Sequence, residues 1–201
     1  NGAFLMGCFM ITILKVSAEQ AYAMFRPYHH LFKSYRDASK GDCYYKCTLL
    51  QVLQGLEYAI KFDWYKFKTF NVKEYEQYER VENGDLNWII PGKFMAFMGP
   101  IEKRDAHQRY GHHPNKYTEI FKKFHVSRVV RLNEEKYDKK YFLENGIEHN
   151  DLFFIDGSTP PDNIVHRWME LCDHHFSQPG AGAIAVHCKA GLGRTGTLIG
   201  L

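Results

Sequence analysis

The pattern of apolar and polar residues divides the chain near residue 70. Before this point, Ala3–Leu14 is a continuous apolar run of twelve residues, and in Cys47–Ile60 apolar residues recur at helical spacing. Between these stretches, Ser17-Ala-Glu-Gln20 is typical of a capping box that opens a helix running through Phe25. Residues 1–70 are therefore predicted to be mainly helical.

The apolar run at Ala3–Leu14 raises the question of a membrane segment. It is shorter than the ~20 residues that a helix needs to span a bilayer, and no basic segment precedes it. We expect a buried core helix and no insertion into a membrane.

Residues 71–84 are polar and are predicted to form a linker helix. Tyr75, Tyr78 and Val81 recur at three-residue steps, and Gly84 is a typical helix terminator. This linker is expected to separate the helical region 1–70 from residues 85–201, where the pattern is different.

From residue 85 onward, apolar strand-like segments alternate with helical segments. The predicted strands are Phe94–Met98, Ser127–Leu132, Leu152–Ile155 and Ala183–Val186, and the predicted helices are Tyr117–Phe124, Asp138–Asn145, Pro160–Cys172 and Thr195–Leu201. Alternation of this kind indicates an α/β domain with a mostly parallel central sheet flanked by helices.

The segment Ile101–Lys116 interrupts this alternation and is predicted to be a loop. Its Lys103, Arg104 and Arg109 are candidates for attracting a phosphate group. Exposed basic loops are common, however, and a solvated loop is the plainer interpretation.

The segment Val186-His-Cys-Lys-Ala-Gly-Leu-Gly-Arg-Thr-Gly196 carries the strongest chemical signal. It places Cys188 and Arg194 at the two ends of a loop between a buried strand and a helix. The glycines in the loop permit positive φ and close backbone approach, so that successive N–H groups converge on one anion. The predicted phosphate-binding residues are Lys189, Ala190, Gly191, Leu192, Gly193 and Arg194.

The same loop is suited to thiolate attack on a phosphate ester. Thiols at helix N-termini near cations have pKa values of roughly 3.5–7.5, so Cys188 is predicted to be the nucleophile at neutral pH. The planar guanidinium of Arg194 is expected to hold two phosphoryl oxygens. Thr195 is expected to donate its hydroxyl to the sulfur, and His187 to support the loop through hydrogen bonds.

Two other interpretations of this loop are weaker. A nucleotide-binding P-loop needs Gly-Lys followed by Ser or Thr, and the chain contains no such triplet. Cys188 as an ordinary buried thiol would not account for its occurrence together with Arg194, two loop glycines and a preceding strand.

A poor alkoxide leaving group also needs a proton, and Asp156 is the candidate general acid. It lies in Phe153-Phe-Ile-Asp-Gly-Ser-Thr-Pro-Pro161, where an apolar strand is predicted to end and Thr159 is predicted to cap a helix that starts at Pro160. In a parallel sheet this loop shares an edge with the Cys188 loop. Asp162 is the rival acid, but its place in the first helical turn already explains it.

Composition narrows the classes of protein to consider. The chain has 201 residues, 45% of them apolar, and a net charge of +3, which does not suggest nucleic-acid binding. Five cysteines without a CxxC pair indicate a reducing compartment. We expect Cys43 and Cys47 to pack in a core, and the histidine pairs at 29–30, 112–113 and 174–175 to be solvated. No metal and no cofactor is expected.

With these residues described, a resemblance can be stated. Cys-x5-Arg followed by Thr195 resembles the protein tyrosine and dual-specificity phosphatase superfamily. More narrowly, three blocks resemble the cell-division-cycle-fourteen family of dual-specificity protein phosphatases: His187–Gly200, Asp156-Gly-Ser-Thr-Pro160 and Glu82–Pro91.

The resemblance implies two tandem phosphatase-like domains, of which the first is inert. Residues 1–70 would be the C-terminal part of that first domain, 71–84 the linker helix, and 85–201 the catalytic domain, truncated at its C-terminus. Ala3-Phe-Leu-Met-Gly7 echoes Gly196-Thr-Leu-Ile-Gly200 and falls where the corresponding helix of the first domain is expected. The chain is thus expected to be an internal fragment.

The resemblance also implies an activity. It points to a protein phosphatase in cell-cycle control that hydrolyses proline-directed phosphoserine or phosphothreonine, and phosphotyrosine, through a phosphocysteine intermediate. The implied location is the nucleus and cytoplasm, including the centrosome or spindle. A phosphoinositide phosphatase is the first alternative, weakened because Leu192 stands where related lipid phosphatases carry a lysine. A catalytically silent phosphopeptide-binding module is the second.

The predicted linker is acidic. Glu76, Glu79, Glu82 and Asp85 would lie near one another, which in isolation indicates a solvated helix face. In the resembled family this region forms an acidic groove that prefers a basic residue downstream of the phosphoserine. These four residues are therefore candidate contacts to a substrate Lys or Arg.

Overall fold

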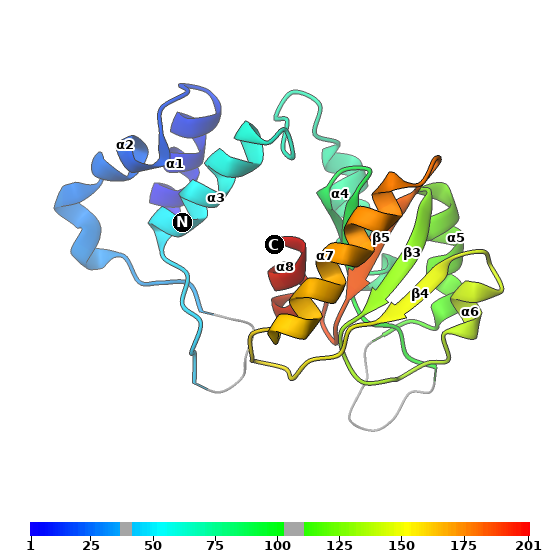
Figure 1. Ribbon diagram of the computed structural model, residues 1–201. Coiled ribbons are helices and arrows are strands. Elements are labelled where there is room, and N and C mark those ends of the chain that lie inside the picture. The colour runs from blue at the N-terminus through cyan, green and yellow to red at the C-terminus, as the bar shows by residue number, and fades with distance from the viewer. Residues whose placement is uncertain (37–41, 103–110) are drawn as a thin grey trace. The chain divides into compact units, whose positions relative to one another are not determined.

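The computed structural model describes residues 1–36, 42–102 and 111–201. The chain divides into two compact units, Asn1–Phe70 and Asn71–Leu201, which are described separately (Figure 1). Lys103, Arg104 and Arg109 lie outside the described residues, so their predicted role is not assessed.

The first unit is helical, as predicted. Its elements are α1 (Gly2–Thr12), α2 (Ala18–Ala23), the 3-10 helix η1 (Arg26–Leu31) and α3 (Leu49–Lys61). The predicted capping box is confirmed, because the Ser17 hydroxyl accepts from the Gln20 N–H and the Gln20 side chain accepts from the Ser17 N–H. α2 ends at Ala23, two residues earlier than predicted, and the chain continues into η1.

Helix α1 is only partly buried within its unit. The unit's small core joins Ile11 of α1 to Leu49 and Leu53 of α3. Gly7 allows this contact, because a Cβ there would lie 2.8 Å from the Leu53 methyl groups. Leu5, by contrast, is 72% exposed, as expected for a helix that is apolar on every side but packs on one. The prediction of a buried core helix is therefore wrong for most of its length.

The cysteine prediction for this unit is also wrong in part. Cys43 is partly buried, whereas Cys47 is exposed. The backbone of Cys47 pairs with that of Tyr35: the Tyr35 N–H donates to the Cys47 carbonyl oxygen at 2.8 Å. Thr48, directly after this bridge, caps α3, so residue 47 lies outside the helical stripe that suggested its burial.

The second unit is an α/β domain around a five-stranded sheet of order β1-β2-β5-β3-β4. The strands are β1 (Leu86–Ile90), β2 (Phe94–Phe97), β3 (Val126–Arg131), β4 (Glu148–Asp151) and β5 (Ala183–His187). β1 and β2 are antiparallel, and all other pairs are parallel. The predicted fold class, a mostly parallel sheet flanked by helices, is confirmed.

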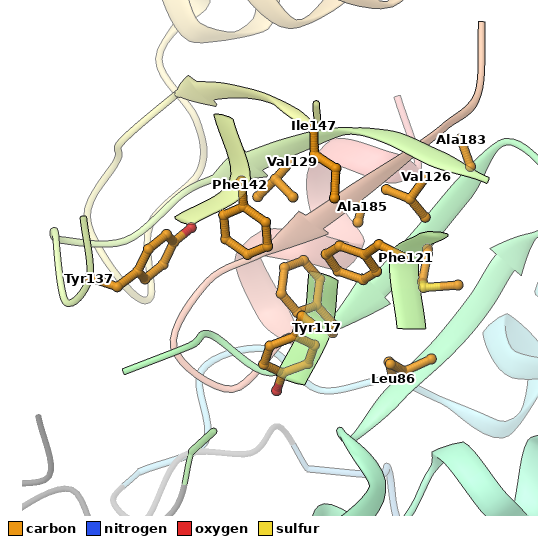
Figure 2. Close-up of a cluster of buried hydrophobic side chains, with 12 residues drawn as sticks. Leu86, Tyr117, Phe121, Val126, Val129, Tyr137, Phe142, Ile147, Ala183 and Ala185 are labelled. Atoms are coloured by element: carbon orange, nitrogen blue, oxygen red, sulfur yellow. The ribbon is translucent and has the colours of Figure 1, made fainter. Parts of the chain in front are cut away.

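Helices cover both faces of this sheet. They are α4 (Val72–Tyr78), the 3-10 helix η2 (Val81–Asn83), α5 (Pro114–Lys123), α6 (Lys140–Leu143), α7 (Asp162–Ser177) and α8 (Gly193–Ile199). Ala183 and Ala185 of β5 face a core with α5 and α6, whereas Ile184 and Val186 face a core with α7 and α8. Figure 2 shows the first of these cores, with Tyr137 at one end and Val126 and Ala183 at the other.

Two predicted boundaries in this unit are wrong for identifiable reasons. The strand expected at Leu152–Ile155 lies instead at Glu148–Asp151, because polar residues are tolerated on an edge strand and gave no apolar pattern. The helix expected to start at Pro160, with Thr159 as its cap, starts at Asp162 with Pro161 as the cap. Pro161 disfavours helical geometry for the residue before it, so Pro160 stays outside the helix.

Other departures concern β1 and the histidines. β1 was not predicted, and the linker helix is split into α4 and η2 before Gly84, whose φ of 124° ends it. His175 is buried and not solvated, since its ring nitrogens contact Arg128 Nε at 3.0 Å and the Gly182 carbonyl oxygen at 2.9 Å. In the part of the chain that is described, no helix is long and apolar enough to cross a bilayer.

The aromatic core on the α5 side gives a stability prediction. Phe121 is fully buried, and its ring centroid lies 5.0 Å from that of Phe97 and 5.9 Å from that of Phe142. Phe121→Ala should lower the free energy of unfolding of this unit by about 3–5 kcal/mol. Urea denaturation followed by circular dichroism measures this. Leu143→Ala, at a half-exposed position, should change it by less than about 1 kcal/mol; equal effects would contradict the core assignment.

Candidate active site

The Cys188 loop lies at the C-terminal end of the central strand. β5 is buried along its whole length and is paired on both sides, with β2 and with β3. Cys188 follows directly and is itself buried, whereas Lys189, Ala190, Leu192 and Gly193 are exposed. The loop therefore opens to solvent above a rigid, fully paired strand, where ligand sites of parallel sheets occur.

Close backbone contacts fix the shape of this loop. Gly191 has a φ of 71°, and a Cβ there would lie 2.3 Å from the Phe97 carbonyl oxygen. The Gly99 N–H donates to the Lys189 carbonyl at 3.1 Å, and a Cβ on Gly99 would lie 2.2 Å from the Cys188 carbonyl oxygen. Gly193 differs from the prediction: it lacks a positive φ, has open space around it, and begins α8.

The loop lowers the pKa of the Cys188 thiol. Burial by itself would raise this pKa, but hydrogen bonds from the Thr195 hydroxyl and from the N–H groups of Thr195, Leu192 and Gly191 favour the thiolate and outweigh it. The Thr195 hydroxyl is buried and finds no oxygen or nitrogen partner among the described residues. It is thus available to the sulfur.

Backbone carbonyls hold one side of the Arg194 guanidinium, and Asp156 faces the other side. It is buried, and its Nη1 donates to the carbonyl oxygens of Phe154 at 3.0 Å and Leu132 at 3.3 Å. Its Nε lies 3.2 Å from Asp156 Oδ1, within ion-pair range but without the alignment of a hydrogen bond. Two backbone carbonyls therefore orient the guanidinium and leave the Nε edge for an anion.

The structure brings Asp156 to this site. Its side chain is 70% exposed and its carboxylate contacts Arg194, although Asp156 lies in the loop after β4 and Arg194 in the first turn of α8. Asp162 occupies the first turn of α7, as expected for a residue with a structural role. Of the two candidate acids, Asp156 is the one in contact with the loop arginine.

His187 supports the loop from below. It is fully buried; its Nδ1 lies 2.9 Å from the Cys188 carbonyl oxygen, and its Nε2 lies 2.7 Å from the Tyr137 hydroxyl. Burial lowers the pKa of His187 to about 3, so the ring is neutral. Neither Tyr137 nor Gly99 is predictable from the sequence, because both act through tertiary contacts with residues 187–189, far away in the chain.

The acidic candidates are distributed from α4 to the start of β1, where the Asp85 carbonyl oxygen accepts from the Met98 N–H at 3.0 Å. Glu76, Glu79 and Glu82 are exposed, and Asp85 is partly buried with a φ of 49°. Burial, followed by the charge of Glu79, raises the pKa of Asp85 despite an opposing effect of His112. Glu79 thus lies near Asp85, and no described side-chain contact joins any of the four residues to the Cys188 loop.

The described residues contain no group of three or more His, Cys, Asp or Glu side chains that could hold a metal ion. The reactive groups of the site are the Cys188 thiol, the Arg194 guanidinium and the Asp156 carboxylate. A parallel sheet with a Cys-x5-Arg loop at the C-terminal end of its central strand is the arrangement of the cysteine-dependent phosphatases.

Comparisons with known proteins agree with this class. Residues 1–59 match the family described as "Dual specificity protein phosphatase, N-terminal half", and residues 109–201 match "Polymorphic toxin system, DSP-PTPase phosphatase". The chain is 51% identical to human "Dual specificity protein phosphatase CDC14A", covering 99% of this chain and 33% of that protein. It is 46% identical to the Caenorhabditis elegans "Tyrosine-protein phosphatase cdc-14", and the match covers 99% of this chain and 28% of that protein.

The chain therefore belongs to the CDC14 family of dual-specificity phosphatases, and it spans about a third of the length of the curated relatives named above. Solved structures match more weakly. Tk-PTP in its active form and PTPMT1 are 18% and 19% identical, each with a TM-score of 0.42 and each covering 53% of this chain and 64% of the other.

The Thr195 contact predicts how the thiol titrates. Thr195→Ala removes a donor to the thiolate, so the pKa of Cys188 should rise and less thiolate should be present at neutral pH. Iodoacetamide alkylation of Cys188, followed by mass spectrometry across a pH series, should show a midpoint at higher pH than in the unsubstituted protein.

Thr197→Ala is the matched control for this experiment. Thr197 lies on the same helix, is exposed, and donates to the Gly193 carbonyl at 2.9 Å and not to the sulfur. Its substitution should leave the midpoint in place. An unchanged midpoint in Thr195→Ala would contradict the assigned role of this hydroxyl.

Proposed function

We propose that the protein hydrolyses phosphate monoesters on proteins through a phosphocysteine intermediate. The observation that carries this proposal is the pairing of a thiol of lowered pKa with an arginine whose Nε edge already faces an anion, the exposed and exchangeable carboxylate of Asp156. Cys188 and Arg194 are separated by a loop whose N–H groups already stabilise negative charge on the sulfur. A phosphoryl group placed over the sulfur would meet the same donors.

In the first step the phosphoryl oxygens bind the loop N–H groups and Arg194 and displace the Asp156 carboxylate from Nε, and the released carboxylate takes up a proton from solvent. A lone pair of Cys188 Sγ forms the S–P bond while the P–O ester bond breaks and its electron pair goes to the leaving oxygen. The donors, fixed before the substrate arrives, stabilise the charge that spreads over the phosphoryl oxygens. The leaving oxygen takes its proton from Asp156.

In the second step water attacks phosphorus, the S–P bond breaks, and its electron pair returns to Sγ. The Asp156 carboxylate, now without its proton, takes the proton of the attacking water. Inorganic phosphate then leaves and the thiolate is restored. Thr195 assists because its hydroxyl stabilises the departing thiolate.

The proposed substrates are phosphoproteins, with phosphoserine or phosphothreonine before proline, and phosphotyrosine, in cell-cycle control. Leu192, exposed between Gly191 and Gly193, supports a protein over a phosphoinositide, because a multiply phosphorylated ring would gain from a cation at this position. The proposed location is the nucleus and cytoplasm, including the centrosome or spindle. The exposed glutamates of 76–82 are proposed to favour a basic residue downstream.

One experiment tests the reaction and the substrate class together. A full-length protein containing this chain is assayed on a phosphoserine-proline peptide with a downstream lysine, a phosphotyrosine peptide and a soluble phosphoinositide. Both peptides should be turned over, and Cys188→Ser should abolish turnover. Dominant turnover of the lipid would overturn the substrate class, and binding of phosphopeptide without turnover would favour a silent binding module.

Asp156→Asn tests the general acid. It should lower kcat on the phosphoserine peptide by ~10²–10⁴-fold, because a serine alkoxide needs a proton to leave. The loss should be smaller on p-nitrophenyl phosphate, whose phenolate is a better leaving group. Equal losses on both substrates would assign Asp156 a role in binding and not in proton transfer.

The acidic segment gives a selectivity prediction. Replacing Glu79 and Glu82 together by Lys should remove the preference for a peptide with a downstream lysine over its alanine version, a difference of about 2–5-fold for exposed charges. The comparison uses kcat/KM for the two peptides. Glu119→Lys, an exposed glutamate on α5, should leave the preference intact; retention of the preference in the double variant would reject the groove.

A further inference from the structure

A chain of buried hydrogen bonds runs from the Cys188 carbonyl to strand β4 at the sheet edge. The Tyr137 hydroxyl lies 2.7 Å from His187 Nε2 and 2.8 Å from His149 Nε2, and His187 Nδ1 lies 2.9 Å from the Cys188 carbonyl oxygen. The side chains of His149 and His187 are fully buried and Tyr137 is nearly so. Tyr137 closes the aromatic core shown in Figure 2.

If His187 donates to the Cys188 carbonyl, counting protons sets the direction of the other bonds in this chain. A carbonyl oxygen only accepts, so His187 Nδ1 must carry a proton to bond Cys188. His187 is neutral, which leaves its Nε2 bare and able only to accept from the Tyr137 hydroxyl. With its single proton committed, the Tyr137 oxygen accepts from His149, so His149 must be protonated on Nε2.

The other nitrogen of His149 shows why this tautomer is not guaranteed. Nδ1 is buried without a hydrogen-bond partner in the described structure and lies 3.9 Å from Asp151 Oδ2. Asp151 is held by Arg131, whose Nε is 2.6 Å from Oδ1. Burial lowers the pKa of His149 to about 4, so the ring is neutral and carries a single N–H proton. That proton can be on Nε2, which faces Tyr137, or on Nδ1, which faces the Asp151 carboxylate.

The alternative tautomer would reverse the whole chain. With the proton on His149 Nδ1, the Tyr137 hydroxyl would donate to His149 Nε2, and His187 would protonate Nε2 to donate to Tyr137. His187 Nδ1 would then present a lone pair to the Cys188 carbonyl oxygen, and the bond that holds the loop would be lost. The productive direction is favoured because a proton on Nε2 keeps all three hydrogen bonds of the chain, whereas a proton on Nδ1 meets no acceptor within hydrogen-bond distance, Asp151 Oδ2 being 3.9 Å away.

We propose that His149 is a positioning residue which, through Tyr137, fixes the tautomer of His187 and so holds the backbone of Cys188 in its catalytic geometry. This role deepens the proposed function, on which it rests. His149 contacts neither the substrate nor the sulfur, and it belongs to an edge strand separated from β5 by β3. Through Tyr137 it determines which nitrogen of His187 carries the proton, and it takes no part in the transfer of the phosphoryl group.

The test compares His149→Phe with His149→Gln in the full-length protein. Phenylalanine fills the space of the ring but cannot donate to Tyr137, whereas the glutamine amide reaches a similar position and can donate. His149→Phe should lower kcat/KM on the phosphoserine peptide about tenfold, the effect of one lost hydrogen bond. It should also move the pH midpoint of Cys188 alkylation, and His149→Gln should restore both.

His175→Phe is the matched control, because it also replaces a buried, hydrogen-bonded histidine of this unit but one bonded to Arg128 and Gly182. It should leave the alkylation midpoint in place even if it lowers stability. A His149→Phe protein that folds and keeps both kcat/KM and the midpoint would overturn the proposal. So would equal losses in His149→Phe and His149→Gln.

A direct reading of the tautomers keeps the proposal testable if the variants do not fold. Nitrogen-15 NMR of the unsubstituted protein should show His149 protonated on Nε2 and His187 on Nδ1. A proton on His149 Nδ1 would refute the proposed direction. Neither NMR nor alkylation requires turnover, so failure of the phosphatase activity itself, seen as no difference between the unsubstituted protein and Cys188→Ser, remains distinguishable.

Discussion

The close contact between two backbone segments, Cys188–Gly191 and Phe97–Gly99, is the constraint on which this site depends. Two glycines make it possible, since a Cβ on Gly99 or on Gly191 would lie 2.2 or 2.3 Å from a carbonyl oxygen of the opposite segment. The contact presses the loop against the end of β2 and aims its N–H groups at the sulfur. Without that approach the thiol would lose the N–H groups of Gly191 and Leu192, which help to offset the rise in pKa that burial causes.

Electrostatics at the site follow from this geometry. Cys188 is buried enough for its hydrogen bonds to be strong, yet the donors around it outweigh the cost of burying charge. Cys172 shows the opposite result in the same unit: burial, followed by the charge of Asp173, raises its pKa to about 12. Arg194 and His187 are in turn oriented by backbone carbonyls, so the polar groups of the site are held by main chain more than by one another.

Sequence reasoning predicted the parts of the fold that local patterns encode. The parallel strands β2, β3 and β5 and the capping box at Ser17 followed from apolar periodicity and capping chemistry. β4 is not predictable in this way, because its residues are polar and lie at a sheet edge, and the burial of His175 is not, because its partners come from distant segments.

The same distinction applies to the site. The loop from Cys188 to Arg194 is contiguous in sequence and was recognisable, and Asp156 followed from its place at the end of a predicted strand. Tyr137 and His149 reach the loop only through tertiary contacts, and neither spacing nor residue type identified them. Gly193 was assigned a positive φ on residue type, whereas the structure needs that freedom at Gly191 alone in this loop.

The ion pair between Asp156 and Arg194 has a consequence for which anions the site prefers. A carboxylate already lies against Arg194 Nε, so every incoming anion exchanges with a single negative charge and does not meet a bare cation. A monoanion gains little from that exchange, whereas a phosphate dianion gains the second charge and three oxygens for the loop N–H groups. The ion pair thereby favours binding of a dianion over a monoanion. Because the Asp156 side chain is largely exposed, its carboxylate is solvated by water when an anion displaces it.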